Sequence, residues 1–268
     1  MRIVFDIGGT HIRVARAEGR APRDVKRAAT PPEAEKGYET LVMLIERVAG
    51  AEGIEAIVGG VAGVIREDGT IVASPNMPGW NGFTLGTRLF AQFHISVTVL
   101  NDVLLATLGE ASRGAGRKHH VVAHLRIGTG VGGACVAGGK LDEHARGFEP
   151  GHQIVDYATG ATLESLTGGA ALARTHGVEP ARLTHDVYRS ATRALAAGVW
   201  NAIVHWSPDV VVLGGSLMNE ETAYRLTEVH AEVEALCSVI PVLPEIRVGT
   251  LGDDAGLYGA CAAFARTV

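Results

Sequence analysis

The chain has 268 residues, 47% of them hydrophobic and 20% charged, which suits one large or two moderate globular domains and excludes a disordered protein. A formal net charge of −5, from 24 basic and 29 acidic residues, argues against nucleic-acid binding through a basic surface. Three widely spaced cysteines, no signal segment and no apolar run of membrane-spanning length argue against disulfides, secretion and a membrane span, so we expect a cytoplasmic protein.

The first residues predict a β-hairpin that could bind an anion. An apolar run over 2–5 is interrupted by Asp6-Ile7-Gly8-Gly9-Thr10 and resumes with apolar residues at 12 and 14. Two glycines let backbone N–H groups approach an anion, Thr10 adds a hydroxyl donor, and Asp6 is placed to face an accompanying cation. An ordinary hairpin with a solvated Asp6 explains these five residues equally well.

The remainder of the first half predicts an α/β domain of roughly 100 residues. Its expected elements are a polar strand and loop over 16–32, a helix from 37 that Gly50 closes, a strand over 54–58, a small hairpin over 65–72, a shaped loop over 74–82, a helix over 85–93, a strand over 97–100 and a helix over 103–111. The strand over 54–58 leads into a glycine-rich segment that ends at Gly63, and the strand over 97–100 leads into Asn101-Asp102.

The second half repeats this plan. It opens with a hairpin of strands 121–127 and 131–136 around the turn Gly128-Thr129-Gly130. A helix over 186–206, a strand over 210–213 that ends in Gly214-Gly215, a helix over 222–236, a strand over 246–248 and a helix over 254–264 follow. Two α/β halves that each begin with a glycine-turn hairpin predict a duplicated fold.

Glycines or polar residues follow five of the predicted strands, and ligands bind beyond the carboxyl ends of parallel strands. Two Gly/Thr turns could together hold a polyphosphate, with Mg²⁺ supported by a carboxylate through water. The sequence contains no GxxxxGK[ST], which excludes a P-loop. It also has no GxGxxG opening a helix after the first strand, which argues against a dinucleotide-binding fold.

Seven motifs in this order resemble those of the ROK family, in the sugar-kinase/Hsp70/actin superfamily, over nearly the whole chain. They are Asp6-Ile7-Gly8-Gly9-Thr10, Ser74-Pro75-Asn76 with Gly79-Trp80, Asn101-Asp102 with Gly109-Glu110, Gly128-Thr129-Gly130-Val131-Gly132, Glu149-Pro150-Gly151-His152, Gly214-Gly215, and the segment 252–260. The resemblance implies two actin-like (ribonuclease H-like) domains around a central cleft. We expect them to comprise residues 1–105, completed by a helix over 254–268, and residues 106–253.

The resemblance also implies ATP and Mg²⁺ as cofactors. The nucleotide would be bound by the first turn, the second turn and the adenosine motif: Gly8, Gly9, Thr10, Gly128, Thr129, Gly130, Gly214 and Gly215. Asp6 would hold Mg²⁺ through water. The resemblance further suggests a homodimer, although the sequence shows no interface.

A sugar hydroxyl must lose a proton as it attacks phosphorus, and we expect Asp102 to accept that proton as general base. Asp102 also precedes Val103 in a position that suits a helix N-cap. The predicted sugar contacts are Gly63, Asn76, Asn101, Asp102, Glu149, His152 and, with an uncertain alignment, Glu164. The asparagines could instead be turn residues, and His152 a buried core histidine.

One departure from the family pattern concerns zinc. Many ROK members follow the Gly-His segment with a Cys-x-Cys-Gly-x-x-Gly-Cys module, whereas residues 156–164 here contain no cysteine. Thiolates are the ligands that such a site requires, so we expect no structural zinc.

We expect the remaining histidines, including His119, His120 and His144, on the surface.

The leading hypothesis is an ATP-dependent sugar kinase, with a hexose such as glucose as acceptor and its 6-hydroxyl as the reacting group. A kinase for fructose, mannose, allose or N-acetylmannosamine is the first alternative. A sugar-sensing ROK repressor and a non-catalytic relative are the others. The retained Asp102 and the phosphate turns favour an enzyme over a non-catalytic relative. We expect a small sugar as its partner, and neither nucleic acid nor a membrane.

Overall fold

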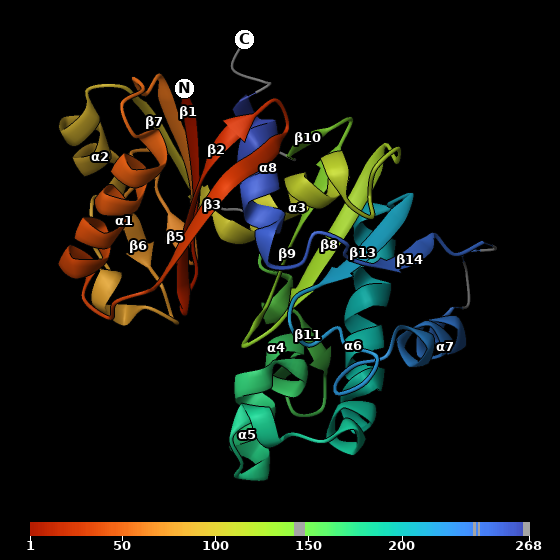
Figure 1. Ribbon diagram of the computed structural model, residues 1–268. Helices are drawn as coiled ribbons and strands as arrows, with labels where there is room; N and C mark the ends of the chain where they lie inside the picture. The colour runs from red at the N-terminus through yellow and green to blue at the C-terminus, as the bar shows by residue number, and fades with distance from the viewer. Residues whose placement is uncertain (142–147, 238–239, 241, 265–268) are drawn as a thin grey trace. The chain divides into compact units, whose positions relative to one another are not determined.

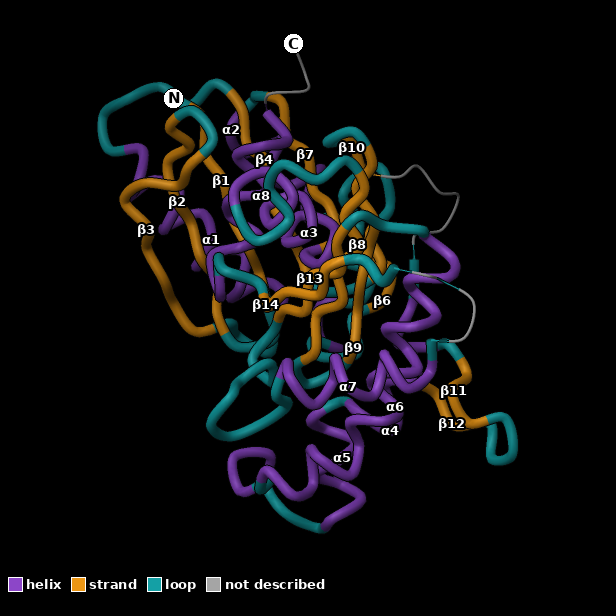
Figure 2. Tube along the Cα trace, turned by 90° about the vertical axis from the view of Figure 1, so that its right-hand side faces the viewer, coloured by secondary structure: helices purple, strands orange, loops and turns teal. Residues whose placement is uncertain are grey.

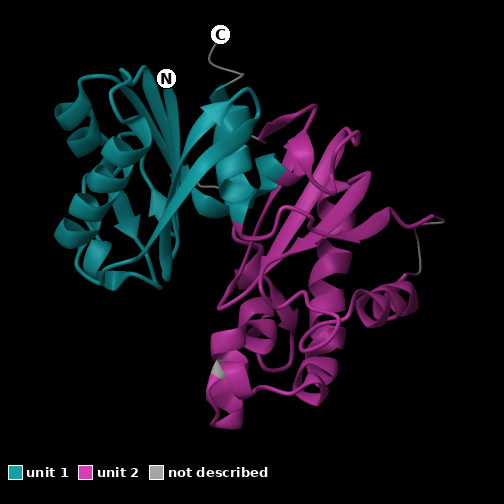
Figure 3. Ribbon diagram, in the orientation of Figure 1, with its two compact units in different colours: residues 1–109, 254–268 teal, residues 110–253 magenta. Residues whose placement is uncertain are grey.

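The computed structural model describes residues 1–141, 148–237, 240 and 242–264 (Figure 1). It divides into two compact units, Met1–Gly109 with Asp254–Val268, and Glu110–Asp253 (Figure 3). We call them unit 1 and unit 2. The boundary falls within helix α3 (Asp102–Arg113). His144, which we expected on the surface, lies outside the described residues.

Unit 1 is built on a five-stranded sheet in the order β3-β2-β1-β4-β7. The strands are β1 (Arg2–Ile7), β2 (His11–Glu18), β3 (Ala21–Ala29), β4 (Ala56–Val61) and β7 (Ser96–Asn101). The first three form an antiparallel meander, and β4 and β7 continue the sheet parallel to β1. The carboxyl ends of β1, β4 and β7 therefore lie at one edge of the sheet.

Helices cover both faces of this sheet (Figure 1). Alternate residues of β1, namely Ile3, Phe5 and Ile7, pack in a buried cluster with α1 (Ala34–Ala49) and α2 (Leu85–Phe93). Val4 points to the opposite face, where it packs with α8 (Ala255–Phe264). Because strand side chains alternate, Asp6 shares the α8 face with Val4.

The chain between β4 and α2 forms a loop with little regular structure. It contains the two-stranded hairpin of β5 (Val64–Ile65) and β6 (Ile71–Ala73) and the single turn η1 (Pro78–Trp80). The fully buried Trp80 ring anchors the loop, since its Nε1–H donates to the Pro31 carbonyl at 3.0 Å. The predicted hairpin and shaped loop are both present.

Unit 2 repeats the sheet of unit 1, in the order β10-β9-β8-β13-β14. The strands are β8 (Val121–Ile127), β9 (Val131–Ala137), β10 (Lys140–Leu141), β13 (Val210–Gly214) and β14 (Glu245–Val248). Again three antiparallel strands are followed by two that run parallel to the first. The predicted α/β class and duplication are confirmed by this shared strand order.

The helices of unit 2 form a large core with the sheet through residues such as Leu195, Val199 and Val229. They are α4 (Leu163–Thr167), α5 (Gly169–His176), α6 (His185–Trp206) and α7 (Leu226–Leu236), with single turns η2 (Pro150–His152), η3 (Pro180–Arg182) and η4 (Gly252–Asp254). The hairpin of β11 (Ile154–Asp156) and β12 (Ala161–Thr162) extends beyond α4 and α6 (Figure 2).

Two details differ from the sequence expectations. Helix α7 begins at Leu226 rather than near Thr222, because residues 217–224 fold back on themselves through hydrogen bonds such as Tyr224 N–H to the Leu217 carbonyl, at 3.0 Å. His124, which we expected on the surface, is buried in the middle of β8.

Over the described residues, no helix combines the length and the apolar composition needed to cross a membrane.

Candidate functional site

The first glycine turn joins β1 to β2 and is fixed from the end of β3. The Gly8 N–H donates to the His11 carbonyl at 3.0 Å, which closes the turn. The Thr30 hydroxyl donates to the Gly8 carbonyl at 2.7 Å, and the Thr30 N–H donates to the Thr10 carbonyl at 3.0 Å. Gly9 and Thr10 are exposed at the tip, where a ligand can reach them.

Asp6 lies just before this turn as a buried, ion-paired carboxylate. The Arg13 guanidinium, opposite it on β2, donates to Asp6 Oδ2 at 3.2 Å. Helix α8 closes the other side, since a Cβ atom built on Gly256 would lie 2.8 Å from Asp6 Oδ1. Only 7% of the Asp6 surface is exposed, so its position is set by the surrounding protein.

Gly60 separates Asp6 from the second predicted carboxylate, Asp102. The strand register pairs Asp6 with Gly60, and Gly60 with Leu100. A Cβ atom on Gly60 would lie 3.5 Å from Asp6 Oδ1 and 3.2 Å from the Asp102 Cα atom. The structure therefore brings both acids to the edge where β1, β4 and β7 end.

Asn101 is the residue that caps α3. Its Oδ1 atom accepts hydrogen bonds from the backbone N–H groups of Val103 and Leu104, at 2.9 and 3.1 Å. The interpretation of Asp102 as the N-cap is therefore wrong, because Asp102 is the first residue of the helix itself. Since Oδ1 is used within the protein, any contact of Asn101 with a sugar would come from Nδ2.

Asn101 also connects the helix to Gly63, as its Nδ2 atom donates to the Gly63 carbonyl at 2.8 Å. Gly63 has a φ of +129°, and a Cβ atom there would collide with the Ala73 carbonyl, so only glycine fits. Asn76 is exposed and borders the first turn, with its Cβ atom 3.3 Å from a Cβ built on Gly9. All the predicted residues of unit 1 thus lie in one neighbourhood.

In unit 2, the second glycine turn joins β8 to β9. The Gly128 N–H donates to the Gly130 carbonyl at 2.9 Å. Helix α5 begins against this turn, because the N–H groups of Gly169 and Ala170 donate to the Gly128 and Thr129 carbonyls at 2.9 and 3.0 Å.

Glu164 lies on α4 beside the same turn. Its Oε2 atom accepts a hydrogen bond from the Val131 N–H at 2.7 Å. A Cβ atom on Gly130 would collide with this carboxylate, so the turn and the acid are in direct contact. The Glu164 carboxylate is held by the protein at a defined position.

Glu149 directly precedes the η2 turn and His152 is its last residue, with the His152 N–H donating to the Glu149 carbonyl at 3.0 Å. Gly151 lies against the Val131 carbonyl at the start of β9, which places η2 next to the second turn. Both Glu149 and His152 are exposed, so the interpretation of His152 as a buried core histidine is wrong.

The adenosine motif follows β13 and also borders the second turn. Gly215 has a φ of +93° and lies so close to the Ile127 carbonyl that a Cβ atom would collide with it. The Leu217 N–H donates to the same carbonyl at 3.1 Å, and Ser216 Oγ lies 3.6 Å from a Cβ built on Gly128. The predicted residues of unit 2 therefore surround one turn.

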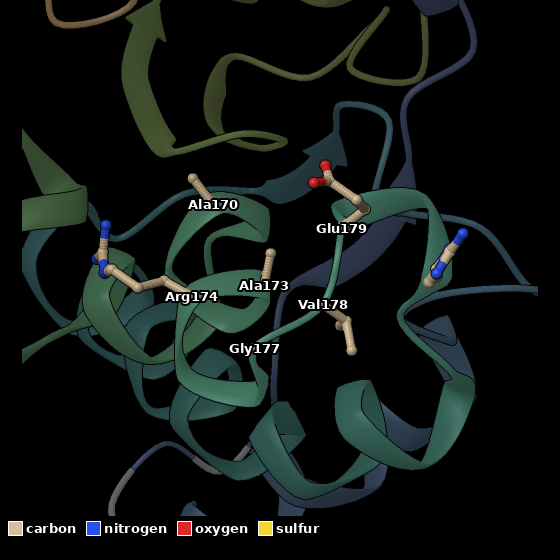
Figure 4. Close-up of a pocket in the computed structure, with 7 residues that line it drawn as sticks. Ala170, Ala173, Arg174, Gly177, Val178 and Glu179 are labelled. Carbon is tan, nitrogen blue, oxygen red and sulfur yellow. The ribbon is translucent and has the colours of Figure 1, made fainter.

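Two features of unit 2 were missed in the sequence. The His124 ring lies beneath Gly214, since a Cβ atom built on Gly214 would be 2.5 Å from the His124 Nε2 atom. Burial, with a smaller effect of the Arg126 charge, lowers the pKa of the His124 imidazole to about 3. A cavity of about 650 Å³ lies beside α5 (Figure 4). It is lined by Ala170, Ala173, Arg174, Gly177, Val178, Glu179 and Arg182.

Neither feature has a local motif. A polar residue in the middle of an apolar strand was the only available signal for His124.

The donor set bears on which metal the chain could hold. Within the described ranges, no cluster of three or more His, Cys, Asp or Glu side chains is arranged to bind an ion. Mg²⁺ needs fewer protein ligands, because it keeps several waters and binds substrate phosphates together with one or two carboxylates. Asp6, beside the first turn, has the chemistry for such a contact.

Comparison with known proteins shows which family and fold the chain resembles. A glucokinase from Halalkalibacterium halodurans is 31% identical over 245 residues, which cover 75% of this chain and 73% of that enzyme. The fold matches a ROK hexokinase from Thermus thermophilus with a TM-score of 0.88 and 27% identity, over 99% of this chain and 98% of the other. A ROK family glucokinase from Streptomyces griseus, in complex with glucose and AMPPNP, matches with a TM-score of 0.80 and 24% identity, over 100% and 99%.

The predicted actin-like fold is thus confirmed by solved relatives of the same fold. The model of the ROK family matches residues 2–267 of this sequence. The chain belongs to the ROK family.

Proposed function

We propose that the protein is an ATP-dependent sugar kinase that phosphorylates a hexose, with glucose as the first candidate and the 6-hydroxyl as the acceptor. The observation that carries this proposal is that two acidic residues border Gly60 at the edge of the unit 1 sheet, Asp6 through its carboxylate and Asp102 through its Cα atom. Two acids in different surroundings can take different roles. Asp6 is paired with Arg13 beside the first glycine turn, whereas Asp102 is the first residue of α3.

Asp102 acts as the general base in this proposal. The sugar hydroxyl oxygen attacks the γ-phosphorus of ATP, its proton passes to the Asp102 carboxylate, and the bond from phosphorus to the β–γ bridging oxygen breaks to release ADP. Capping of α3 by Asn101 supports the assignment, because the helix start does not need the Asp102 side chain for its cap.

Asp6 would orient the waters of the Mg²⁺ ion that accompanies ATP. When bound, the ion offsets the negative charge that develops on the phosphates. The Arg13 contact favours a charged Asp6, which a water-mediated metal contact requires.

The nucleotide would use both glycine turns. Gly8, Gly9 and Thr10 in unit 1, and Gly128, Thr129 and Gly130 in unit 2, offer backbone N–H groups and hydroxyls to phosphate oxygens. A relative solved with AMPPNP supports ATP as the donor.

We assign the adenosine to the surroundings of Gly214 and Gly215 and to the cavity beside α5. Ala170 lines that cavity, and its backbone N–H bonds the second turn, so a nucleotide held at the turn lies close to it. The small side chains of Ala170 and Ala173 leave room for a flat base.

The acceptor sugar would contact Gly63, Asn76, Asn101 and Asp102 from unit 1, and Glu149, His152 and Glu164 from unit 2. Amides and carboxylates of this kind suit vicinal hydroxyls, which both donate and accept hydrogen bonds.

A coupled assay of ADP release tests the proposal over glucose, mannose, fructose, allose and N-acetylhexosamines. We expect ADP release that requires both a hexose and Mg²⁺. Asp102→Asn should lower kcat by at least about a hundredfold, as expected for loss of a general base. Asp24→Asn is a matched control, since Asp24 is exposed on β3 with a φ of +52°, which asparagine also tolerates.

Absence of turnover with every sugar would contradict the proposal and favour a non-catalytic ROK protein. Turnover of a different sugar from glucose would retain the mechanism and change the acceptor.

A further inference from the structure

We propose that Gln153 is a positioning residue for the sugar site, at the centre of a metal-free hydrogen-bonded module over residues 153–165. The inference rests on the proposed function, since it concerns how the candidate sugar contacts on either side of the module, Glu149 with His152 and Glu164, are held in place.

Gln153 bonds to three separate parts of unit 2. Its Nε2 atom donates to the Pro150 carbonyl at 2.8 Å, which fixes the η2 turn. Its Oε1 atom accepts from Asn201 Nδ2 at 2.6 Å, which ties the segment to α6. Its backbone carbonyl accepts from the Leu163 N–H at 2.9 Å, one residue before Glu164. One residue therefore joins both groups of sugar contacts to the longest helix of the unit.

The chain between Gln153 and Leu163 closes as a hairpin through hydrogen bonds of its own, and Val155 packs it against the core of unit 2. Asp156 Oδ1 accepts from the Ala158 N–H at 3.0 Å, and Oδ2 accepts from the Thr159 hydroxyl at 2.7 Å. The Gly160 N–H donates to the Asp156 carbonyl at 2.9 Å, and its φ of +72° allows the reversal.

The far end of the module fixes the start of α4. The Ser165 N–H donates to Thr162 Oγ1 at 3.2 Å, and the Thr162 N–H donates to Ser165 Oγ at 2.9 Å, which is a reciprocal capping box. Because Glu164 lies between these residues, its backbone is held by the cap while its carboxylate bonds Val131.

This segment does not fit the zinc site that the resemblance places here in many other ROK members. A structural zinc site needs four ligands, chiefly thiolates. The cysteines of the chain, Cys135, Cys237 and Cys261, all lie outside this segment. Both oxygens of the Asp156 carboxylate already accept hydrogen bonds. Hydrogen bonds, rather than a metal, hold the two groups of sugar contacts in this chain.

The test compares Gln153→Ala, Asn201→Ala and the double variant with the wild-type protein. If Gln153 positions the sugar contacts, each single variant should raise the sugar KM about tenfold, as small misplacements of binding groups do, with the ATP KM within about twofold. The double variant should resemble Gln153→Ala, because Gln153→Ala already removes the one bond that Asn201→Ala removes. Gln92→Ala on α2 is the control, since Gln92 is exposed and should leave both constants unchanged.

Zinc content and hydrogen exchange are two readouts that do not depend on turnover. Elemental analysis of the full chain purified without chelator should find no stoichiometric zinc, and EDTA treatment followed by excess Mg²⁺ should leave the sugar KM unchanged. Hydrogen exchange of peptides over 153–165 should be faster in Gln153→Ala than in the wild-type protein.

An active wild-type enzyme with an unchanged sugar KM in Gln153→Ala would overturn this inference alone, as would stoichiometric zinc whose removal raises that KM. An unchanged exchange rate over 153–165 would also overturn it. A wild-type protein that phosphorylates no sugar would overturn the proposed function and this inference with it.

Discussion

Asn101 caps the helix that Asp102 begins. The Asn101 Oδ1 atom accepts the N–H groups of Val103 and Leu104, and its Nδ2 atom bonds the Gly63 carbonyl. Two adjacent polar residues thus divide the work at the end of β7: Asn101 holds the helix and the loop after β4, and Asp102 is presented at the sheet edge. Their roles can be separated by mutation.

Asn101→Ala should destabilise unit 1 by about 1 kcal/mol, because it removes the cap of α3. Urea unfolding measures this loss. The sugar KM should also rise, since the bond to Gly63 is lost, whereas Asp102→Asn should lower kcat with little change in stability. Asn101→Asp retains the capping oxygen but loses the donor to the Gly63 carbonyl, so it should recover only part of the stability. Equal stability of Asn101→Ala and the wild-type protein would contradict the capping role.

Gly256→Ala should weaken the use of Mg²⁺ without unfolding the protein. The new methyl group would lie 2.8 Å from Asp6 Oδ1, so it would displace that carboxylate. In α8 itself alanine is favoured over glycine by up to about 1 kcal/mol, so lost helicity is not the expected effect.

The Mg²⁺ concentration for half-maximal activity is the measurement for Gly256→Ala. Gly53→Ala is the matched control, because a Cβ atom there meets nothing within 4 Å. A Mg²⁺ dependence that is the same in both variants would argue against a metal role for Asp6.

Much of the fold could be predicted because its signals are local. Apolar runs that end in glycine predicted β1, β4, β8 and β13, and a four-residue apolar spacing predicted α6. Duplication could be predicted as well, since both halves open on a hairpin with a glycine turn. These features depend on neighbouring residues alone.

The remaining features depend on residues far apart in sequence. Burial of His124 requires Gly214, 90 positions later, where only a missing side chain leaves room for the ring. The Gln153 network depends on Asn201, and the start of α7 depends on the fold-back of 217–224. Either Asn101 or Asp102 could have capped the helix that follows them. Asn101 is the cap because α3 begins at Asp102, one residue earlier than the sequence predicted.

Ala170→Trp should raise the ATP KM by about tenfold or more while the sugar KM stays within about twofold, since bulk placed in a binding site opposes the ligand. Ala170 is exposed and lines the cavity beside α5, so the ring would fill space that we assign to the nucleotide base (Figure 4). Ala231→Trp, on the exposed surface of α7, controls for the added ring. An unchanged ATP KM would exclude the cavity from the nucleotide site.

His124 should make unit 2 less stable in acid. Burial lowers its pKa from 6.5 to about 3, so the unfolded chain binds a proton that the folded chain does not between these values. The imidazole therefore contributes full stability above pH 6.5 and loses it as the pH falls, by about 1.4 kcal/mol per unit.

Urea unfolding at pH 7 and pH 5 should show a loss about 2 kcal/mol larger for the wild-type protein than for His124→Asn, which cannot take up this proton. Comparison of the two proteins removes the contribution of all other titrating groups that they share. The absolute stability of His124→Asn at pH 7 does not enter, because only the change with pH is compared. Equal losses in both proteins would mean that His124 can be protonated in the folded state, which its place beneath Gly214 argues against.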